Sequence, residues 1–426
     1  MVRLIKPAKT FKINFTPPGD KSITHRAMIL AGIAKGECVL RNFSNGRDCL
    51  STIQCLEALG VKSELQEQTL IINGGQLREP QDVLNANNSG TTLRLLCGLL
   101  AGQNFLSFVT GDRYLRKRPV QRVIEPLKKM GAEIWARDNS QYPPLAINGK
   151  PLMGINYQMP VASAQVKSAL LLAGLAAEGK ILIGFDLPSR DHTERMLKSL
   201  GAQIILEKKR IELNSPFIPP AFSCNIPGDF SASAFFITAG VLLPNSEVII
   251  DRVGLNPTRT AFLEVLTRMG AVIKVEKQGE NLGEPFGAIM VKTSDLKGIT
   301  VTADEVPLLI DELMLFGLLG AKAQGVTRIT GAQELRVKES DRIKAVFSQL
   351  NQLGIPVIEH PDGFSVEGPV DFPGGRAESL GDHRVAMLLG LCGLLSQNGV
   401  EVYGFEWADI SFPGFWELLN QASAGD

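Results

Sequence analysis

Positively charged side chains stand at the start of segments that are otherwise apolar. In PGDKSITHRAMILAGIA, Lys21 and Arg26 precede an apolar run, and in GDHRVAMLLGL the same is true of His383 and Arg384. A cation beside a helix N-terminus opposes the helix dipole by about 0.3–1 kcal/mol at an exposed site, so helix stability does not explain these residues. Backbone N–H groups together with Lys or Arg commonly bind phosphate and carboxylate. The sequence therefore predicts anion-binding sites at these helix starts.

Six apolar segments share a polar start. The starts read PGDKSITHR, NNSGTTLR, ASAQVKS, PGDFSAS, LLIDELM and LGDHRVAM. Ser, Asp and Asn caps satisfy the leading N–H groups of a buried helix, which explains the polar residues of any single start but not the cations. If the starts in each half of the chain converge, we expect a ligand cleft between the two halves.

The six helices belong to an internal repeat. A helix ending of the type CLEALGV or PLKKMGA recurs about every 70 residues, followed in most copies by a β-like run. Glycine directly after an apolar periodic stretch indicates a helix C-terminus. The glycines that end the six copies are Gly60, Gly131, Gly201, Gly270, Gly354 and Gly425. Each copy is expected to hold one buried helix, one covering helix and short strands.

The six copies divide into three and three near Ile226. We expect one domain over residues 18–226, with copies 1–3, and a second over residues 1–17 and 227–426, with copies 4–6. The segment RLIKPAKTFKINF precedes the first copy and is expected to pair with the C-terminal half. The chain would then cross between the domains at about residues 16–18 and 226–228.

Bulk composition excludes several classes of protein. Lys plus Arg equals Asp plus Glu at 44 each, so no net charge attracts nucleic acid or an anionic membrane. The six cysteines include no Cys-x-x-Cys pair, which argues against a zinc site or a disulfide framework. No apolar run is long enough to span a membrane, and the N-terminus lacks a secretion signal, so a cytoplasmic location is expected.

Eight motifs in order carry a resemblance to a known family. They are PGDKS-x-x-HR, NSGT-x-x-R, GD-x-x-L-x-x-RP, SAQVKSA, PSRDHTE, LLIDE, LRVKESDR and GDHR. Over essentially the whole chain the sequence resembles the 5-enolpyruvylshikimate-3-phosphate (EPSP) synthases. The resemblance implies an α/β (α+β) fold of two similar domains, each an inverse α/β barrel of three βαβαββ copies, with buried helix N-termini facing the interdomain cleft.

The resemblance also implies a reaction. The family transfers the enolpyruvyl group of phosphoenolpyruvate to the 5-hydroxyl of shikimate 3-phosphate and releases phosphate, in the shikimate pathway to chorismate and the aromatic amino acids. It implies two small-molecule substrates, no metal or other cofactor, no nucleic-acid or membrane partner, and a monomer. Glyphosate inhibits the family, and the glycine at position 90 predicts sensitivity.

The resemblance assigns catalytic roles to three residues. Asp311 would orient and deprotonate the 5-hydroxyl, Glu339 would move the proton at C3, and Lys21 would lie between both substrates as a cation and proton donor. A purely structural alternative for Asp311 is a helix cap.

It assigns binding roles to a larger set. The residues expected at phosphoenolpyruvate are Lys21, Gly90, Arg118, Gln165, Arg342 and Arg384. Those expected at shikimate 3-phosphate are Lys21, Ser22, Arg26, Ser163, Gln165, Arg190, Asp311 and Lys338. Arginine suits these anions because its planar group contacts carboxylate and phosphate through two parallel hydrogen bonds.

The chain departs from the family pattern at three places. Val120 replaces a Met, Ala164 stands where many members have a second Ser, and ADISFP supplies Asp409 and Ile410 where many have a Lys.

Two other functions are possible alternatives. The related UDP-N-acetylglucosamine enolpyruvyl transferases usually carry a reactive Cys or Asp in the mobile loop, whereas GDRYLRKRPVQR has no Cys. A catalytically silent anion-binding paralogue would be expected to lose Asp311 or Glu339. For His25 we favour a core position.

Overall fold

The computed structural model describes residues 1–423, and the chain divides into two compact units. Unit 1 comprises Met1–Pro18, Gly228–Gly279 and the chain from Pro285 onward, and unit 2 comprises Gly19–Pro227 and Glu280–Glu284. Residues 280–284 thus form part of unit 2, although they lie within the range 227–426 that the sequence analysis assigns to the second domain. They join unit 2 because Leu282 packs against its core and Glu284 pairs with His192.

Within residues 1–423 the strands form six sheets, one for each copy of the repeat. The second copy shows the common order: β6 (Leu84–Asn85), α3 (Gly90–Ala101), β7 (Leu106–Thr110), α4 (Gln121–Lys129), β8 (Glu133–Ala136) and β9 (Tyr142–Asn148). Its first strand runs parallel to the second, and the fourth pairs antiparallel with both the second and the third. This is the βαβαββ arrangement that the resemblance implies.

The other two copies of unit 2 follow the same plan. The third copy consists of β10 (Met153–Gln158), α6 (Ala164–Gly174), β11 (Glu178–Gly184), α7 (His192–Ser199), β12 (Ile204–Glu207) and β13 (Arg210–Ser215). The first consists of α1 (Lys21–Gly32), β3 (Glu37–Arg41), α2 (Arg47–Ala58), β4 (Lys62–Gln66) and β5 (Thr69–Asn73). Its missing first strand is supplied by β14 (Ser223–Asn225), which runs parallel to β3.

Unit 1 holds the remaining three copies, apart from residues 280–284 of the fourth, which belong to unit 2. The fourth has β2 (Lys12–Phe15), α8 (Phe230–Leu242), β15 (Glu247–Gly254), α9 (Ala261–Met269), β16 (Val272–Asn281) and β17 (Glu284–Lys292). The fifth has β18 (Thr300–Val301), α10 (Val306–Leu309), α11 (Leu315–Lys322), β19 (Gly325–Ile329), α12 (Arg342–Gln352), β20 (Val357–His360) and β21 (Gly363–Gly368). The sixth has β22 (Gly375–Glu378), α13 (His383–Leu395), β23 (Val400–Tyr403) and α14 (Phe415–Ser423), and is joined by β1 (Val2–Ile5).

The N-terminal segment pairs with the C-terminal half, as predicted. Strand β1 pairs antiparallel with β23, and β2 pairs parallel with β15. The segment therefore completes the sheets of the sixth and fourth copies, whose own sequences lack these strands.

The repeated glycines end helices, as predicted. Within the described residues all of them adopt φ between +90° and +106°, the left-handed region that glycine enters at little cost: Gly60, Gly131, Gly201, Gly270 and Gly354. Gly425 lies outside the described residues.

Five of the six buried helices begin with a side-chain cap. The capping residues are Asp20, Ser89, Ser163, Asp229 and Asp382. The fifth copy differs from the prediction, because LLIDELM supplies only the last two residues of the short helix α10 and then a turn, and α11 begins only at Leu315. Asp311 lies in that turn and is not a helix cap.

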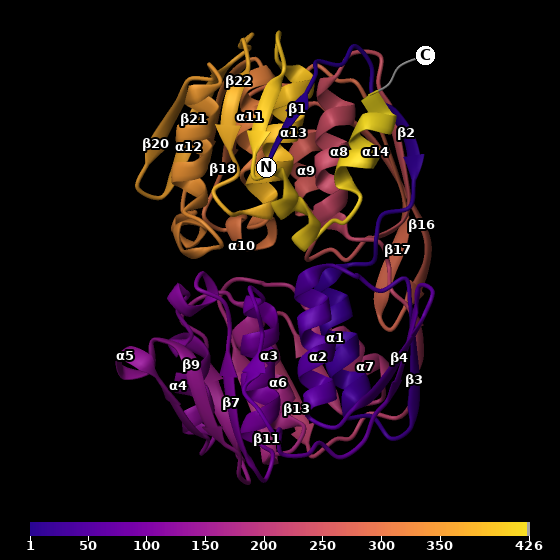
Figure 1. Ribbon diagram of the computed structural model, residues 1–426, viewed down its shortest axis with the longest axis vertical. Coiled ribbons are helices and arrows are strands. Elements are labelled where there is room, and N and C mark those ends of the chain that lie inside the picture. The colour runs from indigo at the N-terminus through magenta and orange to yellow at the C-terminus, as the bar shows by residue number, and fades with distance from the viewer. Residues whose placement is uncertain (424–426) are drawn as a thin grey trace. The chain divides into compact units, whose positions relative to one another are not determined.

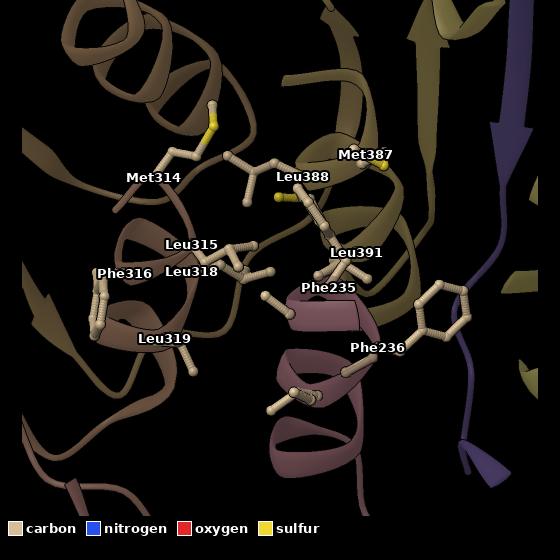
Figure 2. Close-up of a cluster of buried hydrophobic side chains, with 14 of the residues drawn as sticks. Phe235, Phe236, Met314, Leu315, Phe316, Leu318, Leu319, Met387, Leu388 and Leu391 are labelled. Atoms are coloured by element: carbon tan, nitrogen blue, oxygen red, sulfur yellow. The ribbon is translucent and has the colours of Figure 1, made fainter. Parts of the chain in front are cut away.

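The buried helices pack through apolar side chains. In unit 1, α8, α11 and α13 contact one another (Figure 1). Phe235 and Phe236 of α8 belong to one buried cluster with Leu315 and Leu318 of α11 and Leu391 of α13 (Figure 2). This core is expected to hold the helix starts rigidly, because its side chains are closely packed. Truncating one such Leu to Ala would lower the free energy of unfolding by about 2–5 kcal/mol. Among the helices of residues 1–423, none has the length and apolar character needed to cross a membrane.

Candidate active site

The predicted site residues fall into two groups, one in each unit. The unit 1 cluster contains the predicted residues Asp311, Lys338, Glu339, Arg342 and Arg384 together with Asp382, which was not predicted. The unit 2 cluster contains Lys21, Ser22, Arg26, Gly90, Arg118, Ser163, Gln165 and Arg190.

Arg342, the first residue of α12, is the centre of the unit 1 cluster. Its Nη1 lies 3.3 Å from Asp311 Oδ1, and its Nη2 donates to Glu339 Oε2 over 2.8 Å. Its Nε donates to Asp382 Oδ2 over 2.9 Å. The two predicted catalytic carboxylates therefore share one buried guanidinium, at the point where three segments of unit 1 meet.

The charges of this cluster support one another. Burial alone would lower the pKa of Arg342, but the carboxylates of Asp382, Glu339 and Asp311 raise it. Burial alone would raise the pKa of Asp382, but Arg342 and His383 lower it. Both side chains therefore stay charged although they are buried, as expected for a paired buried charge.

Asp311 lies beside a second arginine. Arg384, near the start of α13, donates from Nη1 to the Asp311 carbonyl oxygen over 3.1 Å, and its Nη2 lies 3.5 Å from Asp311 Oδ2. The Asp311 side chain is still 17% exposed and that of Glu339 is 22% exposed, so both carboxylates are accessible to a ligand. Asp311 therefore contacts two arginines and does not act as the helix cap considered as its structural alternative.

Lys338, the residue directly before Glu339 in the sequence, belongs to the same cluster. The side chain is partly buried, and this burial lowers the pKa of Lys338, while Asp311 and Glu339 act in the opposite direction. An added anion would stabilise its charged form.

In unit 2, Lys21 is held by a carboxylate that the sequence analysis did not identify. Its Nζ lies 2.5 Å from Asp48 Oδ2 of α2, and both side chains are largely buried. Asp48 carries no motif signal in the sequence, because its role depends on how α1 and α2 pack.

Arg26 is buried at the start of α1, one turn beyond Ser22. Its Nη1 donates to the Ser22 carbonyl oxygen over 2.8 Å. Burial lowers the pKa of Arg26 to about 10, and the like charge of Arg190 acts in the same direction, against Glu194 and Asp20. Two of the cations expected at shikimate 3-phosphate thus repel each other in the free protein, and a bound anion would relieve the repulsion.

Gly90, Arg118 and Gln165 gather around a further arginine, Arg94. Arg94 Nη1 donates to Gln165 Oε1 over 2.9 Å, and Gln165 Nε2 donates to Thr91 Oγ1 over 3.1 Å. Arg118 Nη2 donates to Asn88 Oδ1 over 2.6 Å, just before Gly90. Arg94 belongs to the motif NSGT-x-x-R, so the sequence carried a signal for it.

The two remaining predicted residues lie at or just before helix starts. Ser163 caps α6 by accepting a hydrogen bond from the Val166 N–H at 3.4 Å. Arg190 lies in the loop before α7. Asp409 and Ile410, which stand where many family members have a Lys, lie in a short 3-10 helix over residues 405–410.

His25 lies in the core, as expected. It is fully buried, and its Nδ1 lies 2.7 Å from Thr52 Oγ1. Burial, together with the charges of Lys21 and Arg26, holds the pKa of His25 well below 6.5. The imidazole is therefore neutral at pH 7.

Comparisons with known proteins agree with this arrangement. The sequence pattern of the family described as EPSP synthase (3-phosphoshikimate 1-carboxyvinyltransferase) matches residues 5–419. A 3-phosphoshikimate 1-carboxyvinyltransferase of Thermodesulfovibrio yellowstonii is 46% identical and covers 99% of both chains, and that of Bacillus subtilis is 43% identical and covers 95% of this chain and 96% of its own.

Solved structures show the same similarity. EPSP synthase from Acinetobacter baumannii superposes with a TM-score of 0.88 at 41% identity, over 99% of this chain and 98% of its own. The enolpyruvyl transferase NikO from Streptomyces tendae has a TM-score of 0.78 at 16% identity, over 100% of this chain and 97% of its own, and this likeness shows the fold alone. The chain therefore belongs to the EPSP synthase family and is an enzyme of that family, a 3-phosphoshikimate 1-carboxyvinyltransferase.

Proposed function

We propose that the residues of the unit 1 cluster and of the unit 2 cluster bind phosphoenolpyruvate and shikimate 3-phosphate and carry out the enolpyruvyl transfer. The observation that carries the assignment of roles is the sharing of Arg342 by two accessible carboxylates, Asp311 and Glu339. Addition of a hydroxyl to the double bond of an enol phosphate needs one group that takes a proton and one that gives a proton, and two carboxylates near one cation can do both.

Asp311 acts on the acceptor hydroxyl. Its carboxylate, oriented by Arg342 and Arg384, accepts the proton of the 5-hydroxyl of shikimate 3-phosphate as the hydroxyl oxygen bonds to C2 of phosphoenolpyruvate. The C2–C3 double bond becomes a single bond when C3 takes up a proton. The product of this step is a tetrahedral intermediate that still carries the phosphate.

Glu339 and Lys21 act at the other side of the reaction. Glu339 exchanges the proton at C3, and Lys21 donates toward the departing phosphate oxygen. Loss of a C3 proton re-forms the double bond as the C2–O bond to phosphate breaks. Protons balance, because the proton added to C3 in the first step is matched by the one removed from C3 in the second. The hydroxyl proton that Asp311 accepts is matched by the proton that Lys21 gives to the departing phosphate.

The other cations bind the anionic groups of the substrates. Arg118, Arg342 and Arg384 contact the carboxylate and phosphate of phosphoenolpyruvate, with Gly90 and Gln165 beside it. The phosphate and hydroxyls of shikimate 3-phosphate are contacted by Ser22, Arg26, Ser163, Arg190 and Lys338. The charge of Arg190 beside Arg26 supports a phosphate at this point.

A phosphate-release assay tests the proposal. We expect release from phosphoenolpyruvate only when shikimate 3-phosphate is added, and no release with UDP-N-acetylglucosamine. Asp311→Asn should lower kcat by about 10²- to 10⁴-fold, whereas the exposed Asp304→Asn should leave it unchanged. Release with UDP-N-acetylglucosamine, or an Asp311→Asn enzyme as fast as Asp304→Asn, would contradict the proposal.

A further inference from the structure

Helix α7 begins with three buried polar side chains that the proposed reaction does not use. His192, Thr193 and Glu194 are each about 1% exposed. Burying polar groups costs free energy unless they are paired, so a row of three at one helix start requires an explanation.

Thr193 contacts the guanidinium of Arg26. Arg26 Nε donates to Thr193 Oγ1 over 2.8 Å, and Arg26 Nη2 donates to Ser168 Oγ of α6 over 2.8 Å. The two hydroxyls are joined in turn, because Thr193 Oγ1 donates to Ser168 Oγ over 2.7 Å. One edge of the planar guanidinium, formed by Nε and Nη2, is therefore held by two hydroxyls that are hydrogen-bonded to each other and come from two different helices.

The residues on either side of Thr193 anchor it. Glu194 Oε1 lies 2.6 Å from Lys167 Nζ, which neighbours Ser168 on α6. His192 Nδ1 lies 2.8 Å from Glu284 Oε1, in the segment 280–284 of unit 2. Thr193 thus has an ion-paired or hydrogen-bonded neighbour on each side, and these neighbours fix the start of α7 against α6 and against residues 280–284.

These contacts leave part of the Arg26 guanidinium for a ligand. A guanidinium has five N–H groups. Among residues 1–423, the partners of Arg26 are Thr193, Ser168 and the Ser22 carbonyl, one each for Nε, Nη2 and Nη1. Each Nη nitrogen keeps one further N–H, and the two hydroxyls decide the plane in which these N–H groups lie.

We propose that Thr193 and Ser168 are positioning residues that orient Arg26 for shikimate 3-phosphate and so set the affinity of the enzyme for that substrate. The inference rests on the proposed role of Arg26 at shikimate 3-phosphate. A pre-oriented arginine binds more tightly because less side-chain freedom is lost on binding. The hydroxyls do not contact the substrate in this proposal, and they act only through Arg26.

The test compares Thr193→Val, which keeps the side-chain shape, with Thr193→Ser, which keeps the hydroxyl. For Thr193→Val we expect the Kd and KM for shikimate 3-phosphate to rise about 10- to 100-fold, the cost of a hydrogen bond to a charged group. The KM for phosphoenolpyruvate should change by less than about twofold. Thr193→Ser should bind shikimate 3-phosphate like the wild type.

A matched control separates positioning from packing. Thr238→Val removes another buried threonine hydroxyl, which donates to the Ala234 carbonyl inside α8. This variant should leave both KM values unchanged. Should Thr193→Val lower Tm more than Thr238→Val, Ser168→Ala provides the same measurement, because it removes the acceptor of Arg26 Nη2 with a smaller change in volume.

The outcomes are distinguishable by calorimetry with shikimate 3-phosphate alone. Wild-type protein that does not bind this ligand would overturn the assignment of the substrate. Wild-type protein that binds it, with the same Kd in Thr193→Val or in a folded Ser168→Ala, would overturn the positioning role alone. An equal rise in both KM values would also overturn it, since that result indicates a general disturbance of unit 2.

Discussion

Arg94 occupies the space that a side chain at position 90 would need. Its Nη1 donates to Gln165 Oε1 over 2.9 Å, and a Cβ added to Gly90 would lie 2.6 Å from the same nitrogen. The Arg94 side chain is buried and its Nη2 also donates to the Pro119 carbonyl, so it cannot move freely. The absence of a side chain at position 90 and the orientation of Gln165 are therefore coupled through Arg94.

We predict that Gly90→Ala displaces the Arg94 guanidinium and weakens its bond to Gln165. The KM for phosphoenolpyruvate should rise about tenfold, the cost of one charge-assisted hydrogen bond, and glyphosate inhibition should weaken with it. In an Arg94→Ala background, Gly90→Ala should have little further effect. Steady-state kinetics of the four proteins measure this, and additive effects of the two substitutions would contradict coupling through Arg94.

Asp382 is predicted to be essential for the stability of unit 1. Asp382→Asn removes the charge that pairs with buried Arg342 and should lower the free energy of unfolding by about 3–5 kcal/mol. As a control, Asp371→Asn removes an 84% exposed carboxylate that pairs with Lys322, and should cost less than about 1 kcal/mol. Urea unfolding of both variants tests this. Equal losses would show that the buried pair has no special importance.

His25 makes stability depend on pH. Its folded pKa lies well below 6.5, so the unfolded chain takes up a proton between pH 6.5 and that lower value, while the folded chain does not. Stability is therefore lost as the pH falls below 6.5, by at most about 1.4 kcal/mol per pH unit from this residue.

The substitution His25→Gln tests this dependence, because Gln can still bond to Thr52 but does not titrate. The free energy of unfolding of the wild type should fall more steeply between pH 6.5 and pH 5 than that of His25→Gln. Identical slopes in urea unfolding at the two pH values would show that His25 protonates equally in both states.

The Lys167–Glu194 ion pair is predicted to tolerate loss of both charges better than loss of one. Both side chains are at most 2% exposed. Lys167→Met alone leaves Glu194 buried without its cation and should cost about 3–5 kcal/mol, whereas Lys167→Met combined with Glu194→Leu should recover part of that loss. Thermal and urea unfolding measure the difference. A double variant less stable than Lys167→Met would contradict this prediction.

Local signals in the sequence predicted much of the architecture. The glycines that end helices, the capping residues and the apolar helices were identified correctly, because helix ends depend on residues within one or two turns. The fifth copy was the exception. Its buried helix was expected to start within LLIDELM, but no side chain of that segment caps α11, and the chain forms a turn before Leu315.

The sequence by itself determined the sixfold repeat, the family and the residue types that the reaction needs, since these follow from periodicity and the order of motifs. Only the tertiary structure decided the partners of those residues. Thr193 reaches Arg26 across 167 residues, Gln165 reaches Arg94 across 71, and Asp48 meets Lys21 from a neighbouring helix. Such pairs depend on how distant segments pack and which side chains become buried together, and no local pattern in the chain encodes that choice.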